Sequence, residues 1–220
     1  MHNLTRDLLD DLRLRIISFQ FAPGEKINEA HISRQLGISR GPVREALRIL
    51  EKEGLIVYVP RKGTSISHTS LEDYEEIIGA REMIECYAID ILREKKIKDL
   101  SGVKATLDKV RDMPVPTSHS TPEEKFAYIK ANVLFHINLV EATGNSLLIQ
   151  YYSTVFNKFA KYEFGYTEDF RLTTIQIKEH RQILEAILDG KYNQAKQYLS
   201  KHIRSRAKTI GAKIRSNRGS

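Results

Sequence analysis

Three arginines recur at every fourth residue of one short segment, a spacing that places them on a single face of a helix. They are Arg40, Arg44 and Arg48. Near the start of a helix, guanidinium groups suit the major groove of DNA, where they bind guanine edges or phosphates. Taken alone, the same spacing is also typical of a solvated cationic helix face, so the neighbouring elements must decide between the two interpretations.

Two short helices with a tight turn between them are predicted around these arginines. Asn28 can cap a helix over 28–36, and Gly37 can supply the left-handed turn that ends it. Ser39 begins a second helix over 39–50, which carries the arginines. Two helices joined by a short turn that contains glycine indicate a helix-turn-helix.

A hairpin with a basic tip follows the second helix. The segments 55–59 and 64–67 have the composition of strands, and the link between them contains Lys62. Such a hairpin, the wing, could reach the minor groove or flanking phosphates. Gly41 would let the start of the second helix approach a phosphate closely. Helix-turn-helix and wing together favour DNA binding over a merely solvated face.

Three histidines stand out because each lies on the apolar stripe of a different predicted helix. They are His136, His180 and His202. A single histidine on such a stripe is usually a satisfied core residue. Three imidazoles that face one interior suit a divalent transition metal, and Asn132, one turn before His136, could add a carbonyl oxygen. The residues alone leave a metal site and a metal-free core both open.

Arg81 lies on an apolar stripe, where a charge should not be buried without a partner. An ion pair with Glu85, four residues further on, or a position at the rim would satisfy it. Alternatively, Arg81 faces a pocket in the bundle and binds a ligand carboxylate through both guanidinium branches.

Beyond residue 70 the sequence shows helical periodicity and no strand pattern. A helix over 4–19, with Phe19 on its apolar side, precedes the helix-turn-helix. Six more helices are predicted at 71–95, 98–111, 122–143, 146–163, 173–189 and 192–213, with Gly165 among the breaks. We therefore expect a mostly α protein with three parts. These are a winged helix-turn-helix over 1–68, an all-α six-helix bundle over 69–214 and a basic flexible tail over 215–220.

The net charge of +7 is unevenly distributed. Residues 1–70 carry a net charge of +3, residues 71–200 carry −3 and residues 201–220 carry +7, which fits a DNA-binding module beside a part with another role. The single cysteine, Cys86, excludes an intramolecular disulfide. No apolar run approaches the roughly 20 residues that span a bilayer, and the first residues are too polar for a signal peptide. We expect a cytoplasmic protein without a membrane partner.

Three sequence blocks resemble the winged-helix domain of GntR-family bacterial transcription regulators over about residues 4–68. They are 21–27, 36–47 and 53–55. The resemblance implies that Ser39, Arg40, Gly41 and Arg44 contact double-stranded operator DNA. It also implies that Lys62 and Gly63 reach the minor groove, and it makes Arg34 and Arg48 candidates for phosphate contacts.

The second half of the chain resembles the FCD ligand-binding domain of the FadR branch, over about residues 71–210, and its six helices are similar to the VanR-like subgroup. The similar segments are 132–136, 142–145, 179–187 and His202. The resemblance implies that Asn132, His136, His180 and His202 bind Zn²⁺, Ni²⁺ or a similar ion, and that a small organic acid is the effector. Asn132 stands where Asp is frequent, and an amide is a neutral and weaker ligand.

These observations predict a homodimeric transcription regulator, acting as a repressor, rather than an enzyme. A carboxylate metabolite bound near Arg81 and the metal would alter operator binding. Two rival functions stay open. A metalloenzyme could use three histidines, although no good general base lies among the candidate residues. An architectural DNA-binding dimer would use the bundle for dimerisation alone.

Overall fold

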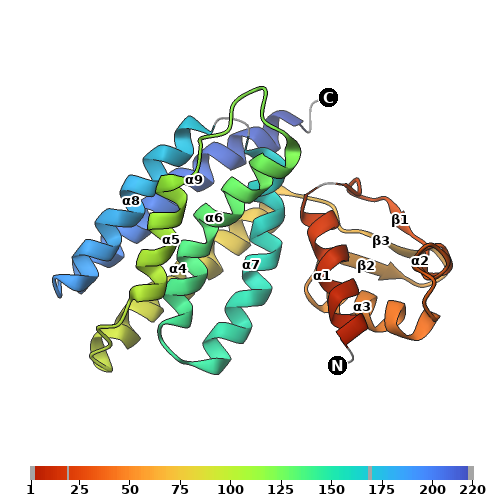
Figure 1. The fold of residues 1–220 in the computed structure, drawn as a ribbon, viewed down its shortest axis with the longest axis horizontal. Helices are drawn as coiled ribbons and strands as arrows, with labels where there is room; N and C mark the ends of the chain where they lie inside the picture. The colour runs from red at the N-terminus through yellow and green to blue at the C-terminus, as the bar shows by residue number, and fades with distance from the viewer. Residues whose placement is uncertain (1–2, 19, 168–169, 218–220) are drawn as a thin grey trace.

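The computed structural model of this 220-residue chain describes residues 3–18, 20–167 and 170–217. A small N-terminal unit stands beside a larger helical bundle (Figure 1). The N-terminal unit comprises α1 (Asn3–Ile17), β1 (Lys26–Ile27), α2 (Glu29–Leu36), α3 (Arg40–Lys52), β2 (Ile56–Val59) and β3 (Gly63–Ile66). The bundle comprises α4 (Leu71–Glu94), α5 (Ser101–Asp112), α6 (Pro122–Glu141), α7 (Ser146–Tyr166), α8 (Arg171–Leu188) and α9 (Tyr192–Asn217). The predicted fold class, a winged helix-turn-helix followed by a six-helix bundle, is confirmed.

Local sequence signals set the helix-turn-helix. The Asn28 side chain accepts a hydrogen bond from the His31 amide at 3.1 Å, so the first turn of α2 is capped as predicted. Gly37 ends α2 at a φ of 64°, a left-handed conformation that favours glycine. The unit is held together by one apolar core. Its members from α1 and α3 are Leu8, Leu9, Leu12, Ile16, Ile17, Val43, Ala46, Leu47 and Leu50.

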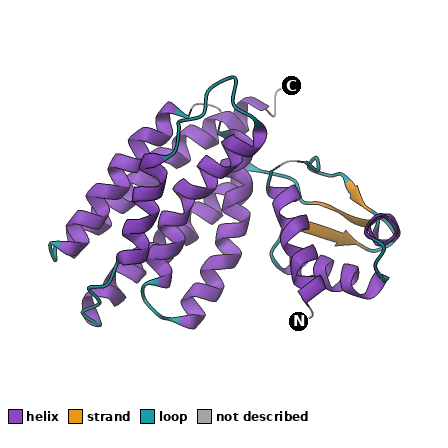
Figure 2. Ribbon diagram, in the orientation of Figure 1, coloured by secondary structure: helices purple, strands orange, loops and turns teal. Residues whose placement is uncertain are grey.

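The sheet has three antiparallel strands in the order β1-β3-β2, all in the N-terminal unit of the described chain (Figure 2). β2 and β3 are the two strands of the predicted wing, and Tyr58 pairs with Thr64 in their register. We did not predict β1, which contains only two residues and pairs Lys26 with Ser65. So short a strand has no alternating pattern of its own, and only its pairing with β3 defines it.

Two predicted helix ends in the bundle are wrong. Gly165 does not break α7, which continues to Tyr166; the Tyr166 ring stacks on Tyr162 at a centroid distance of 6.2 Å. α9 continues to Asn217, so residues 215–217 are helical and not part of a flexible tail. Buried Ile214 holds these last turns against the core. Phe19 and residues 218–220, which we also assigned, lie outside the described residues.

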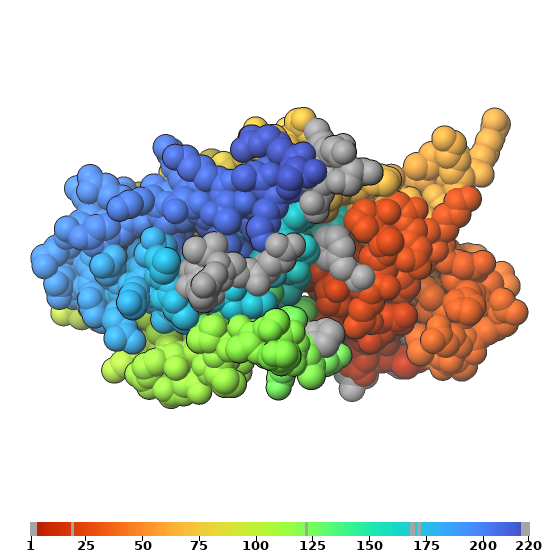
Figure 3. Space-filling view, turned by 90° about the horizontal axis from the view of Figure 1, so that it is seen from above, coloured from red at the N-terminus to blue at the C-terminus, as the bar shows by residue number. Residues whose placement is uncertain are grey.

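None of the helices in the described ranges is long and apolar enough to cross a membrane. The connection between the two units lies along one face of α7. Lys161 donates to the carbonyl of Ser67, and the hydroxyl of Tyr162 donates to Asp73 at 2.9 Å. Ala160 of α7 also joins the apolar core of the N-terminal unit. The space-filling view shows the two units in direct contact (Figure 3), so α7 links the N-terminal unit to the bundle.

Candidate functional site

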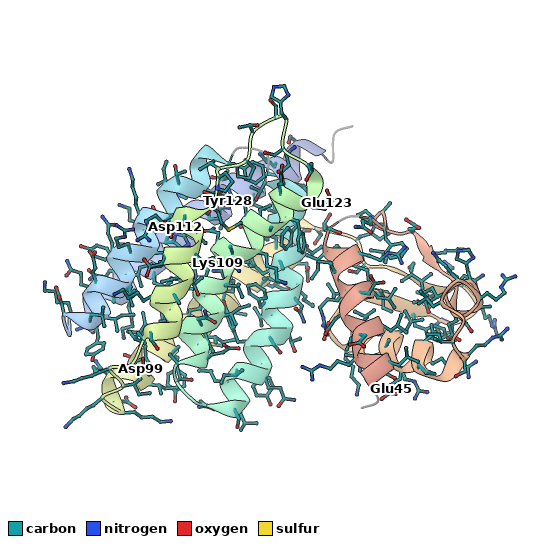
Figure 4. All side chains as sticks on the ribbon, viewed as in Figure 1. Glu45, Asp99, Lys109, Asp112, Glu123 and Tyr128 are labelled. Atoms are coloured by element: carbon teal, nitrogen blue, oxygen red, sulfur yellow. The ribbon has the colours of Figure 1, made fainter. Side chains whose placement is uncertain are left out.

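The cationic face of α3 is open to solvent. Arg40, Arg44 and Arg48 are all exposed, while the opposite face of the helix packs into the core. Figure 4 shows Glu45, an exposed residue of the same helix, on the outside of the N-terminal unit. The arrangement places the three guanidinium groups where an external anion can reach them, as an arginine face for DNA requires.

Arg44 is exposed but has a partner within the chain. Its Nε lies 3.0 Å from a carboxylate oxygen of Glu29 in α2. The Arg44 side chain is 61% exposed and that of Glu29 is 35% exposed. Ion pairs this open to water contribute little to stability, so Arg44 can exchange Glu29 for a phosphate or a base edge.

The start of α3 and the tip of the wing are both open to close approach by another molecule. Ser39 is extended and its hydroxyl makes no capping hydrogen bond. A Cβ added at Gly41 would meet nothing within 4 Å. In the wing, Arg61 and Gly63 both have positive φ angles, 66° and 89°. All eight residues predicted to contact DNA are exposed: Arg34, Ser39, Arg40, Gly41, Arg44, Arg48, Lys62 and Gly63.

Inside the bundle, the three predicted histidines converge. The Nε2 atom of His180 lies 3.1 Å from that of His136 and 3.0 Å from that of His202, and the last two are 3.3 Å apart. With metal–nitrogen bonds of about 2.0–2.1 Å, two ligands are roughly 2.9 Å apart at right angles and roughly 3.3 Å apart in a tetrahedron. The spacing of the three nitrogens therefore matches the distances that one metal ion requires.

Two glutamates fix which nitrogen points inward in two of the three imidazoles. The Nδ1 of His136 lies 2.7 Å from Glu85 of α4, and the Nδ1 of His202 lies 2.7 Å from Glu179 of α8. Each Nδ1 therefore carries the proton and donates, which leaves both Nε2 lone pairs aimed at the same point. Lone pairs this close repel one another unless a cation or a proton lies between them. The donor set thus fits a metal ion.

Burial favours the neutral form of His136 and of His180, the form in which an imidazole binds a metal. Burial is the main cause that lowers the pKa of His136 to about 4; the nearby Arg81 acts in the same direction, and Glu85 opposes the shift. Burial, together with the two other histidines, lowers the pKa of His180 well below its ordinary value. The ring of Phe135 stacks on His180 at a centroid distance of 4.2 Å, which fixes the plane of that ligand.

Asn132 is buried on α6, one helical turn before His136. Its amide nitrogen donates to the Gln176 side chain of α8 at 3.0 Å, while its carbonyl oxygen has no hydrogen-bond partner among the described residues. An unsatisfied buried acceptor is costly. A metal ion would satisfy this oxygen, which supports Asn132 as the fourth ligand.

Arg81 is buried, and the ion pair with Glu85 that we considered from the sequence is present, with Nε 2.7 Å from the carboxylate. Burial alone would raise the pKa of Glu85, but Arg81 and His136 outweigh it and lower that pKa below its ordinary range. The Arg81 guanidinium also lies 3.8 Å from the centre of the Phe159 ring. Its Nη2 has no hydrogen-bond partner in the described part of the chain.

Two family models match the chain. Residues 4–66 match the bacterial regulatory proteins of the gntR family, and residues 76–205, more than half of the chain, match the FCD domain. This chain belongs to the GntR family. It is a transcription regulator with a C-terminal FCD domain, and its relatives and domains are those of regulators, not enzymes.

Named relatives of this GntR-family regulator include a protein from Bacillus subtilis and one from Bacillus licheniformis. The first, an uncharacterised HTH-type transcriptional regulator named YdhC, is 31% identical over 88% of this chain and 84% of its own length. The second, the gluconate operon transcriptional repressor, is 25% identical over 82% of this chain and 69% of its own length. A solved GntR regulator from Rhodococcus sp. RHA1 shares the fold, with a TM-score of 0.79 and 23% identity over 94% of this chain and 96% of that one.

Our sequence reasoning did not find the residues that support the histidines of this GntR-family regulator. We considered Glu85 only as a neighbour of Arg81, yet it also accepts from the Tyr152 hydroxyl at 2.7 Å and orients His136. We also missed Glu179 and Gln176. The one available signal for Glu179 was its position next to His180 in the sequence. A carboxylate often accepts a hydrogen bond from the second ring nitrogen of a histidine that binds a metal.

Proposed function

We propose that this protein is a sequence-specific repressor acting on operator DNA in the cytoplasm, and that a small carboxylate bound near a metal in the bundle modulates its operator binding. His136, His180, His202 and Asn132 would hold a divalent ion such as Zn²⁺ or Ni²⁺, which polarises or binds an effector carboxylate. The observation that carries this proposal is the convergence of three Nε2 atoms within 3.0–3.3 Å, two of them with their Nδ1 atoms anchored on glutamates.

The path from this cluster to the DNA-binding unit supports a coupling between effector and operator. Glu85 accepts from Tyr152 of α7, and two to three turns further along the same helix Lys161 and Tyr162 hold residues 67–73. A ligand that alters the hydrogen bonds of Glu85 would act on the helix that positions the winged unit. A coupling free energy of about 1–3 kcal/mol would alter operator occupancy roughly five- to 150-fold.

We further propose that two copies associate through α4 and α7. These helices pack together through Ile84, Ala88 and Tyr152, and their outer surfaces carry large apolar side chains that a monomer would expose. They are Met83, Tyr87, Leu147 and Tyr151. Exposed apolar surface of this kind is typical of interfaces, and a two-fold dimer would present two winged helices to a palindromic operator.

Operator binding by the purified full chain tests the proposal. The fragment is selected from random DNA by the protein itself, and binding is measured with metal, with chelator, and with half of the palindrome removed. We expect Arg44→Ala to weaken binding roughly 5- to 150-fold, because it removes a base or phosphate contact. Lys104→Ala, which removes an exposed cation of α5 far from α3, is the control.

Binding that is independent of sequence and unaffected by Arg44→Ala would contradict specific regulation. Equal affinity for the whole and half operator would contradict binding as a dimer. A regulator whose operator binding is the same with metal, with chelator and with every carboxylate tested would be an architectural DNA-binding protein instead.

A further inference from the structure

A hollow of about 570 Å³ lies between α5, α6 and α8, away from the converging histidines. Its walls are apolar side chains from the end of α5 and from α8, including Val110, Met113 and Ile177. Figure 4 labels Tyr128 and Asp112 at the same end of the bundle, near the loop that connects α5 to α6. A hollow of this size matches the usual range for sites that bind small molecules.

Tyr128 of α6 lines this hollow and carries an unsatisfied polar group. The residue is 1% exposed, and its hydroxyl has no hydrogen-bond partner among the described residues. Burial raises the pKa of this hydroxyl, so it stays protonated. A buried hydroxyl without a partner is costly, and a ligand with a polar group at its inner end would satisfy it.

The rim of the hollow is cationic. Lys178 and Arg181 of α8 line it and are exposed, and neither has a carboxylate partner within the described ranges. Arg111 also lines it but is held by Asp108 and Asp112. One acidic residue, Glu185, also lines the hollow, against the two cations Lys178 and Arg181. The charge balance at the rim therefore favours an anion.

We propose that this hollow binds a second organic anion, one with a carboxylate at one end, an apolar middle and a hydroxyl or carbonyl group at the other end. The carboxylate lies at Lys178 and Arg181, the apolar part packs on Ile177, and the far polar group pairs with Tyr128. This site is separate from the metal donor set, because α8 forms a wall between the two. On one side of α8, His180 belongs to the histidine cluster and Gln176 binds Asn132. On the other side of α8, Ile177 and Arg181 line the hollow.

Two matched probes test the proposal on the full chain. Chelator-treated protein is titrated with 4-hydroxyphenylacetate and with phenylacetate by saturation-transfer NMR, so that no metal ion competes for the carboxylate. We expect the hydroxylated probe to bind about fivefold more tightly, as one net hydrogen bond implies. Tyr128→Phe should make the two affinities equal without abolishing either.

Further variants locate the probe. Arg181→Ala should weaken both probes by a similar factor, whereas Lys104→Ala on the exposed surface of α5 should weaken neither. Ile177→Trp should fill the hollow and abolish binding. His202→Ala, which removes a metal ligand but touches no wall of the hollow, should leave both affinities unchanged. Circular dichroism confirms that each variant is folded.

Failure of either probe to bind the chelated protein would overturn the proposal. Loss of binding in His202→Ala with full binding in Ile177→Trp would also overturn it, because the probe would then occupy the histidine cluster. Neither result affects the proposed metal-linked regulation, which is measured separately by operator binding.

Discussion

The two candidate sites of this protein are built in opposite ways. On α3, the arginines are exposed, and the pair between Arg44 and Glu29 is open to water. In the bundle, His136 and its partner Glu85 are almost completely buried. The first site is held by few contacts of its own, and in the proposed function it would obtain its partners from an external polyanion. The second has its donors fixed before any ligand arrives.

The two sites differ in whether their side chains must be held in place before the ligand binds. A DNA surface supplies many phosphates, and each arginine can adapt to the one that it meets. A metal ion accepts only a small set of distances, so its ligands must be held in place by neighbours. The bundle obtains that rigidity by burying charges, which are stable only as long as every partner is present.

The largest effect should come from breaking the buried network. Glu85→Ala leaves Arg81 buried without its counter-ion and removes the partners of His136 and Tyr152. We expect the free energy of unfolding to fall by about 3–5 kcal/mol in chelated protein, measured by urea denaturation. Glu82→Ala on the same helix is the matched control: its partner Arg204 is 70% exposed, so the variant should show little change.

Equal effects of Glu85→Ala and Glu82→Ala would remove the contrast between the two sites, because the buried pair would then act like a surface pair. Glu85→Gln separates charge from shape. It keeps an acceptor for Tyr152 but leaves Arg81 unneutralised, so its unfolding free energy should lie between those of the wild type and Glu85→Ala.

The sequence was informative about the exposed site because its signals are local. The Asn28 cap joins residues three apart, Gly37 ends its helix by its own conformation, and the arginines recur at every fourth residue, so each signal lies within a few neighbouring residues. β1 was the exception, since two residues acquire their structure only by pairing with β3.

The buried site could be predicted only in part. The apolar periodicity was sufficient to predict that three histidines face one interior, and in the structure they lie together there. It could not reveal that Glu85 supports His136, since 51 residues separate them. Nor could it show that Gln176 of α8 holds the Asn132 amide. Such pairs arise from the packing of distant helices, and no single segment carries their pattern.

A smaller effect should come from the glutamate that orients His202. Glu179→Ala removes the acceptor for Nδ1, so the imidazole loses both its fixed tautomer and part of its basicity. We expect metal affinity to fall about 10- to 100-fold, measured by competition with a chromophoric chelator. Glu179→Gln restores an acceptor and should recover part of the loss.

Glu185→Gln is the control, because Glu185 is exposed on the same helix and has no hydrogen bond to a histidine among the described residues. A loss of affinity in Glu185→Gln as large as that in Glu179→Ala would show that net charge on α8, and not the orientation of His202, sets the affinity for the metal.

The smallest effect should appear at the exposed site, where we expect that removal of the partner of Arg44 increases the affinity for the operator. Glu29→Ala frees Arg44 from its partner and removes a negative charge from the surface that we propose to meet phosphates. We expect operator affinity to rise by up to about fivefold, more at low salt than at high salt. In an Arg44→Ala background the same substitution should change affinity less, and this double-mutant cycle isolates the pair.

Glu51→Ala, at the far end of α3, is the control. A fall in affinity on Glu29→Ala would mean that Glu29 positions Arg44 as Glu85 positions His136, so that both sites are preorganised and differ only in their exposure to water.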